Sequence, residues 1–100
     1  MAIQAAGKSV IPPMGGSHPP IAIVANLTAV AGTATTFFTL YPCDATAQPL
    51  ASDLNARAGD VVANLTFVAI SQSGISAGNV CLFNDQGTIN AILDVAGWFQ

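Results

Sequence analysis

The apolar and polar residues of this 100-residue chain alternate over short stretches, with the period of two expected of β-strands. Residues 21–30 (IAIVANLTAV) are rich in β-branched side chains and alternate around Asn26 and Thr28. Further strands are predicted at 34–41, 50–56, 60–70, 79–83 and 88–99. No segment longer than about ten residues has the i, i+3, i+4 spacing of an amphipathic helix. The pattern therefore predicts an all-β protein.

Turn-forming residues separate these stretches. Residues 11–20 (IPPMGGSHPP) contain four prolines and two glycines, which excludes a helix or a central strand. NDQG at 84–87 is a predicted hairpin turn in which Gly87 supplies a positive φ. About seven short strands bounded by turns are typical of an antiparallel β-sandwich, immunoglobulin-like or jelly-roll-like. We expect residues 1–20 to form an N-terminal strand and a Pro/Gly-rich segment, a candidate inter-subunit arm, and residues 21–100 to form the sandwich domain.

Alternation along the last predicted strand assigns its side chains to two faces. One face carries Ile89, Ala91, Leu93, Val95 and Phe99, and the other carries Asn90, Ile92, Asp94 and Trp98. A buried Asp94 needs a cationic partner, and Arg57 is one of only two candidates, so we expect a structural Asp94–Arg57 ion pair. Trp98 is expected to pack in the core rather than to serve as a sugar-stacking platform.

The composition narrows the class of protein. Hydrophobic residues make up 52% of the chain and charged residues 7%, against about a quarter charged in average proteins. The chain has five acidic residues and only two basic ones, Lys8 and Arg57. Two cations cannot form a phosphate-binding stripe, which excludes a nucleic-acid-binding function. The longest apolar stretch, 21–32, is shorter than the roughly 20 residues of a spanning helix, so we expect no membrane insertion. The opening MAIQAAGKS lacks the apolar region of a signal peptide, which indicates a mature form or a segment of a longer protein.

The pentapeptide VANLT occurs at 24–28 and again at 62–66, 38 positions later, and Cys43 and Cys81 have the same offset. Two interpretations are open: a diverged duplication with pseudo-twofold halves, or convergence of two strands in similar surroundings. Both predict that the repeated strands form the paired centre of the sandwich. Two cysteines in a small, charge-poor chain favour one disulfide, Cys43–Cys81, over two buried thiols, and a disulfide implies an oxidising compartment.

Motifs that resemble catalytic or binding sites are incomplete. Gly74–Gly78 matches the G-x-S-x-G nucleophile elbow, but the only histidine, His18, precedes the serine and no helix is predicted after it. Residues 7–9 match the end of a P-loop whose first glycine is missing. Two cysteines and one loop histidine are too few for a zinc site, and scattered aspartates leave calcium binding as an open alternative. We therefore expect no enzyme activity, no cofactor and no metal.

The chain contains two N-x-T sequons, Asn26-Leu27-Thr28 and Asn64-Leu65-Thr66. Asn26 and Asn64 are therefore candidate glycosylation sites. Modified sequons usually lie in exposed loops, whereas both of these lie in predicted strands. A structural hydrogen bond made by each asparagine would explain its presence equally well.

Several short motifs are distributed over residues 21–99. They are Leu40-Tyr41-Pro42-Cys43, Ala51-Ser52-Asp53-Leu54-Asn55, Ala58-Gly59, Val62-Ala63-Asn64-Leu65, Val80-Cys81-Leu82-Phe83 and Asp94-Val95-Ala96-Gly97-Trp98-Phe99. Together they resemble the tandem extracellular β-sandwich repeats of actinobacteria and related bacteria. Units of that family decorate secreted enzymes and large surface proteins, with no activity assigned to the unit itself. The resemblance implies an extracellular or cell-surface location and a non-enzymatic role.

One element of that family's units, a first strand with an R-x-LDTR motif, has no counterpart here. A sandwich that lacks an edge strand exposes unpaired N–H and C=O groups, which favours pairing with another chain. The sequence also has almost no lysine to guard such an edge. We therefore expect a structural subunit that assembles with copies of itself into a surface filament or layer by strand complementation. The alternative is a carbohydrate- or cell-wall-binding module of a larger secreted protein, with surface glycans as partners.

Overall fold

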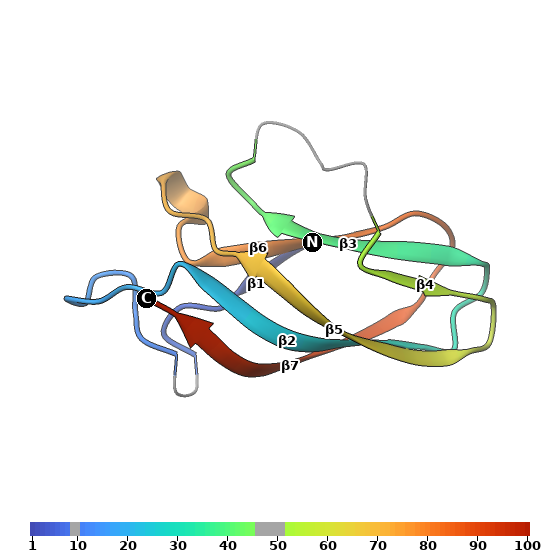
Figure 1. Cartoon of the computed structure of the whole chain (residues 1–100). Coiled ribbons are helices and arrows are strands. Elements are labelled where there is room, and N and C mark those ends of the chain that lie inside the picture. Colours follow the sequence, from blue (N-terminus) through green and yellow to red (C-terminus); the bar gives the residue numbers. More distant parts are fainter. Residues whose placement is uncertain (9–10, 46–51) are drawn as a thin grey trace.

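The computed structural model describes residues 1–8, 11–45 and 52–100, and they form an antiparallel β-sandwich. Its elements in chain order are β1 (Ala2–Gln4), β2 (Ala22–Val30), β3 (Thr36–Pro42), β4 (Leu54–Ala56), β5 (Val61–Ala69), the 3₁₀ helix η1 (Gly74–Ser76), β6 (Asn79–Asn84) and β7 (Asn90–Phe99). One sheet has the strand order β1-β6-β3-β4 and the other β5-β2-β7, and the two sheets lie against each other as layers (Figure 1). The predicted fold class, with seven strands and one disulfide, is confirmed.

The core lies between the two sheets. Every second residue of β2 is buried, including Ile23 and Leu27, because β2 is the central strand of its sheet and turns one face toward the other layer. Phe38 of β3 and Val80 of β6 approach from the opposite sheet and are 1% and 0% exposed. Burying one such side chain contributes about 1.5–3 kcal/mol, so these residues account for much of the stability of the sandwich.

The described part of residues 1–20 packs on the same sandwich. Met1 fixes β1 to β6, since its amino group donates to Leu82 O (3.0 Å) and its carbonyl accepts from Leu82 N–H (2.8 Å). Ala5 and Ile11 are 4% and 5% exposed and belong to the core. The segment that the sequence suggests as an inter-subunit arm thus lies against its own domain.

The two VANLT segments are neighbours in one sheet. β2 and β5 pair antiparallel, with Asn26 opposite Leu65, although β5 is an edge strand and only β2 is central. Cys43 and Cys81 form the predicted disulfide, with their Cα atoms 5.1 Å apart. The pseudo-twofold relation does not extend further. Shifting β7 back by the repeat length of 38 gives residues 52–61, whose strand β4 pairs with β3 in the other sheet.

The turn at 84–87 forms as predicted, but it does not close a hairpin. Gly87 has a φ of 69°, and Asn84 Nδ2 donates to its carbonyl at 2.9 Å. The strands on either side belong to different sheets, since β6 pairs with β1 and β3 while β7 pairs with β2. Turn chemistry is local, whereas the partner of β7 is decided by which sheet its apolar side chains complete.

A β-bulge in β7 overturns the predicted faces of its C-terminal half. Ala96, between Val95 and Gly97, has no register partner on β2, and one extra residue moves each following side chain to the opposite face. Trp98 therefore turns toward the core side and Phe99 toward the outside. Trp98 is half buried and packs against the core, as the sequence analysis expects for this residue.

Candidate functional site

One face of the β5-β2-β7 sheet packs on the core and the other points away from the molecule; we call the second the outer face. Cross-strand partners point to the same side of a sheet, so the register with β2 identifies its residues. They are Ala22, Val24, Asn26, Thr28 and Val30 of β2, Val61, Ala63, Leu65, Phe67 and Ala69 of β5, and Asn90, Ile92, Asp94, Gly97 and Phe99 of β7. Asp94 is the one charged residue among them.

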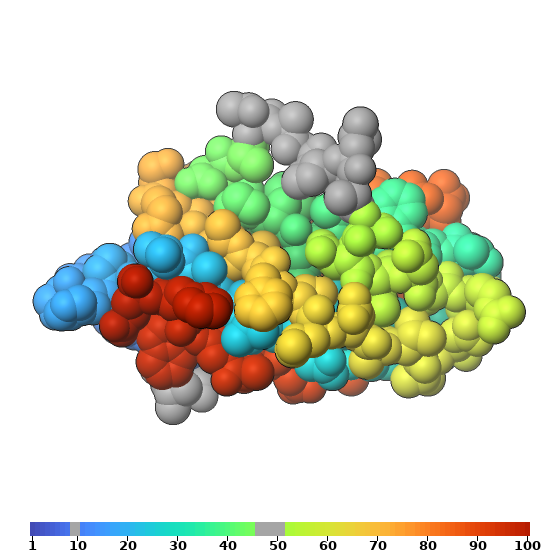
Figure 2. All heavy atoms as spheres, viewed as in Figure 1, coloured from blue at the N-terminus to red at the C-terminus, as the bar shows by residue number. Residues whose placement is uncertain are grey.

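Large apolar side chains are exposed on the outer face. Val61, Leu65 and Phe67 of β5 are 67%, 55% and 66% exposed, and Ile92 and Phe99 of β7 are each 49% exposed. The ring centroids of Phe67 and Phe99 are 6.3 Å apart. Figure 2 shows β5 (yellow), β2 (cyan) and the end of β7 (red) meeting at this surface. A contiguous apolar surface of this kind is typical of an interaction site.

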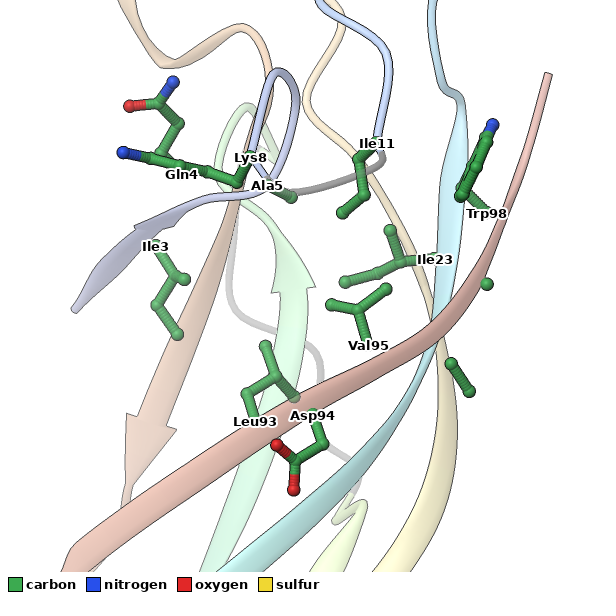
Figure 3. A pocket seen from close by; sticks show the side chains of 12 residues that line it. Ile3, Gln4, Ala5, Lys8, Ile11, Ile23, Leu93, Asp94, Val95 and Trp98 are labelled. Carbon is green, nitrogen blue, oxygen red and sulfur yellow. The ribbon is translucent and has the colours of Figure 1, made fainter.

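On the side of the sandwich where β7 lies opposite β1, the sheets leave a groove between them. Its volume is about 320 Å³, and its lining comes from β1, from the segment that follows β1, from β2 and from residues 93–98 of β7. Leu93 and Val95 point from β7 into the groove, toward Ile3 and Ile11 on its far side (Figure 3). The groove is therefore lined mainly by apolar side chains, of which Val95 is 40% exposed.

β7 is also a free edge, because β2 is the only described strand that pairs with it. On the opposite side of the sandwich the gap between the layers is closed, although β5 likewise pairs only with β2 among the described strands. There β4 lies beside β5 (Figure 1), and Asn64 Nδ2 donates to Asp53 O at 2.9 Å, which links the two layers. The two sides thus differ, and the open one combines an unpaired strand edge with an apolar groove.

The predicted Asp94–Arg57 ion pair is wrong. Arg57 Nε lies 3.3 Å from Asp60 Oδ2, three residues along the chain, and the arginine side chain is 85% exposed. Asp94 is exposed on the outer face, opposite Asn26. The prediction assumed that Asp94 is buried, and an exposed carboxylate needs no cationic partner because water solvates it.

The two sequon asparagines occupy different environments, both within strands. The amide of Asn64 makes the interlayer hydrogen bond to Asp53, which is the structural role that the sequence analysis considered. Asn26 is half buried in the middle of β2, on the outer face, with Asp94 as its register partner on β7.

Two of the scattered aspartates, Asp44 and Asp53, accept hydrogen bonds from the backbone. Asp53 Oδ2 accepts the Leu40 N–H at 2.7 Å, and Asp44 Oδ2 accepts the Gln72 N–H at 2.9 Å. Ser76 ends η1, and β6 follows it, so residues 74–84 do not have the strand–turn–helix arrangement of a nucleophile elbow. Within the described ranges, no group of three or more His, Cys, Asp or Glu side chains is placed to hold a metal ion.

No family model matches this chain, and no curated protein or solved structure matches it either. The part of the chain that the structure describes includes no helix long and apolar enough to cross a membrane. The geometry itself defines a class: a small disulfide-linked antiparallel β-sandwich with an exposed apolar sheet face whose two edge strands, β5 and β7, each pair only with β2 among the described strands.

Proposed function

We infer that this chain is a non-enzymatic, extracellular structural subunit that assembles with copies of itself into a surface filament or layer. The observation that carries the proposal is the outer face, where Leu65, Phe67 and Phe99 are 55%, 66% and 49% exposed and Asp94 is the only charge. Removing apolar surface from water gains about 25 cal/mol per Å². Packing this face against another copy therefore stabilises an assembly.

The low charge and the disulfide both support the proposal. Charged residues make up 7% of the chain, so repeated contacts between copies desolvate few ions, which is the main cost of burying polar surface. The Cys43–Cys81 disulfide is typical of proteins that work in oxidising compartments, outside the cytosol.

The outer face is too small for its packing against another copy to hold an assembly together by itself. Three strands of about nine residues, roughly 3.3 Å per residue and 4.8 Å apart, give a footprint of about 400 Å². Stable interfaces bury about 800 Å² on each partner. A regular assembly therefore needs a second contact, and the free edge of β7 beside its groove supports strand complementation as that contact.

The pair of exposed rings at Phe67 and Phe99 supports a second candidate function, a module that binds cell-wall polysaccharide. Aromatic rings on a flat surface offer an apolar platform for a sugar ring. Sugar hydroxyls also need converging hydrogen-bond partners, and the outer face offers only Asn26, Thr28, Asn90 and Asp94 among its polar side chains. We therefore rank assembly first.

A glycan would act differently at the two sequons. On Asn26 it would stand in the middle of the outer face and oppose packing, and on Asn64 it would displace the hydrogen bond to Asp53. We expect assembled material to carry no glycan at Asn26. The masses of peptides from native assemblies test this, and a glycan on Asn26 in those assemblies would argue against a packed outer face.

The decisive experiment compares two exposed apolar residues. Phe67→Ser removes a ring from the outer face, whereas Ile75→Ser removes a more accessible apolar side chain from η1, since Phe67 is 66% and Ile75 is 107% exposed. We expect fibres or sheets by electron microscopy for the wild type and Ile75→Ser, and dispersed particles for Phe67→Ser. A wild-type chain that stays monomeric by light scattering at high concentration would contradict the proposal.

The same variants test the second candidate. A polysaccharide-binding module would sediment with insoluble cell-wall material as a monomer, and Phe67→Ser would abolish the sedimentation while Ile75→Ser would not. Sedimentation of the monomer would move the assignment from structural subunit to binding module.

A further inference from the structure

Two backbone hydrogen bonds show which groups of β7 point to its free edge. Ala31 N–H donates to Asp60 O, and Ile70 N–H donates to Ile21 O, both at 2.9 Å. They flank the first and last pairs of the β2–β5 ladder, which makes both of these non-hydrogen-bonded pairs. Because pair types alternate along an antiparallel ladder, the even-numbered residues of β2 turn their N–H and C=O groups away from β5 and toward β7.

The backbone groups of β7 then follow from its register with β2. Asn90, Ile92 and Asp94 lie opposite even-numbered residues of β2, so they hydrogen-bond to β2. Ala91 and Leu93 alternate with them and direct their N–H and C=O groups to the free edge. No proline, lysine or arginine occurs in β7 to block an approaching strand. Residues 90–94, which lie before the bulge at Ala96, therefore form an edge that another strand can pair with.

We propose that β7 pairs antiparallel with β7 of a second copy about a twofold axis at Ile92, which joins two β5-β2-β7 sheets into one continuous sheet. The proposal rests on the assembly function and names one of its joints. Ile92 lies opposite Ile92 of the second copy, Ala91 opposite its Leu93, and Asn90 opposite its Asp94. Two copies of the same edge strand can pair their free backbone N–H and C=O groups in this way, because a twofold interface is self-complementary.

Charge selects this register over axes nearer the C-terminus of β7, and an axis at Ala91 would pair only residues 90–92, because β7 begins at Asn90. The backbone N–H and C=O groups on the free edge of one β7 must lie opposite those of the other. The twofold axis therefore passes through a residue, and alternative registers place it at successive residues of β7. An axis at Asp94 sets two carboxylates directly opposite each other, which is destabilising. An axis at Leu93 sets Asp94 opposite Ile92 and leaves the carboxylate against an apolar side chain. The axis at Ile92 places Asp94 between Asn26 of its own β2 and Asn90 of the second copy, both able to donate hydrogen bonds.

A cysteine at the axis tests the register. We expect Ile92→Cys to form a disulfide-linked dimer on mild oxidation, because residues opposite each other in a non-hydrogen-bonded pair have Cα atoms about 4.5 Å apart. Leu65→Cys is the control, since Leu65 is exposed at the centre of the other edge strand, β5. Peptide mass spectrometry confirms that Cys43–Cys81 stays intact. Equal dimer yields for the two variants, or a dimer only for Leu93→Cys, would overturn the proposed axis.

A matched pair of prolines tests the ladder without relying on oxidation. Ala91→Pro removes an N–H that points to the free edge of β7, and Ala63→Pro removes the equivalent N–H on β5, so neither breaks a bond to β2. We expect Ala91→Pro to raise the concentration needed for pairing by roughly tenfold or more, because the twofold axis doubles each loss. Ala63→Pro should leave it unchanged. Thermal unfolding by circular dichroism verifies that both variants fold.

The outcomes separate this joint from the assembly function as a whole. A wild-type chain that is monomeric at every concentration would overturn both. Assembly that is lost in Phe67→Ser but unchanged in Ala91→Pro, without an Ile92→Cys dimer, would overturn the β7 joint alone. If copies paired instead through an N-terminal segment displaced from its own domain, Ile92→Cys would stay monomeric under oxidation. That result would also overturn the β7 joint.

Discussion

Removing the Cys43–Cys81 disulfide should cost this chain a large part of its stability. The bridge joins the residue after β3 to the middle of β6, across a sequence separation of 38. Closing a loop of this length restricts the unfolded chain by about 4 kcal/mol at 25 °C in the chain-entropy treatment. A domain of this size has a free energy of unfolding of about 5–15 kcal/mol. The double variant Cys43→Ala/Cys81→Ala should therefore remain folded but lose roughly 15–30 °C in Tm.

The assay is thermal and guanidinium unfolding followed by circular dichroism, with reversibility checked at each step. Wild-type protein in excess reductant is the matched control, and it should lose the same stability as the double alanine variant, because both free the same loop. The denaturant dependence of unfolding should also steepen, since an unbridged chain exposes more surface when it unfolds. A loss in Tm below about 5 °C would refute the reasoning, because the unfolded state would then be compact without the bridge.

Three further substitutions test the packing and the turns, each by guanidinium unfolding. Phe38→Ala should lower the free energy of unfolding by about 3–5 kcal/mol, because Phe38 is 1% exposed between the sheets; a loss below about 1 kcal/mol would mean that the core collapses around the gap. Gly87→Ala should cost about 1–3 kcal/mol, since φ is +69° and a Cβ would lie 2.6 Å from a threonine hydroxyl, whereas Gly15→Ala, with nothing within 4 Å, should be near neutral. Thr36→Val should cost about 1–3 kcal/mol, because the buried hydroxyl donates to Asn84 Oδ1 at 2.6 Å; an unchanged stability would show that this bond is replaced by water.

Sequence periodicity was a sound guide where a strand is regular and central. β2 alternates strictly between half-buried and buried residues, so its pattern predicts both its existence and its faces. Alternation failed in β7, because a bulge inserts one residue and reverses the faces beyond it. The neighbouring Ala96 and Gly97 carry the available signal, since glycine inside a strand pattern indicates a bulge or a close approach. A Cβ on Gly97 would indeed lie 3.3 Å from Val24 Cγ1.

The wrong ion pair and the wrong hairpin have a common cause. Both predictions assigned partners without knowing on which sheet, and on which face of it, the residues of β7 lie. Arg57 takes the nearby Asp60, because a short-range surface pair orders little chain. Residues 84–87 turn as their chemistry predicts, yet β7 crosses to the other sheet and pairs with β2. The groove and the free edge of β7 follow from that crossing, so local sequence patterns could not predict them.

The composition of β5 connects the fold to the proposed assembly. A strand with one solvated face alternates apolar and polar residues, whereas a strand buried on both faces is apolar throughout. β5 reads VVANLTFVA; its outer face is apolar throughout, whereas its core side carries Asn64 and Thr66. Val68 is 5% exposed on the core side, and Phe67 next to it is 66% exposed on the outer face. A single chain covers only the core side. The outer face of β5 therefore has the composition of a covered face, and another copy of the chain supplies that cover in the assembly that we propose.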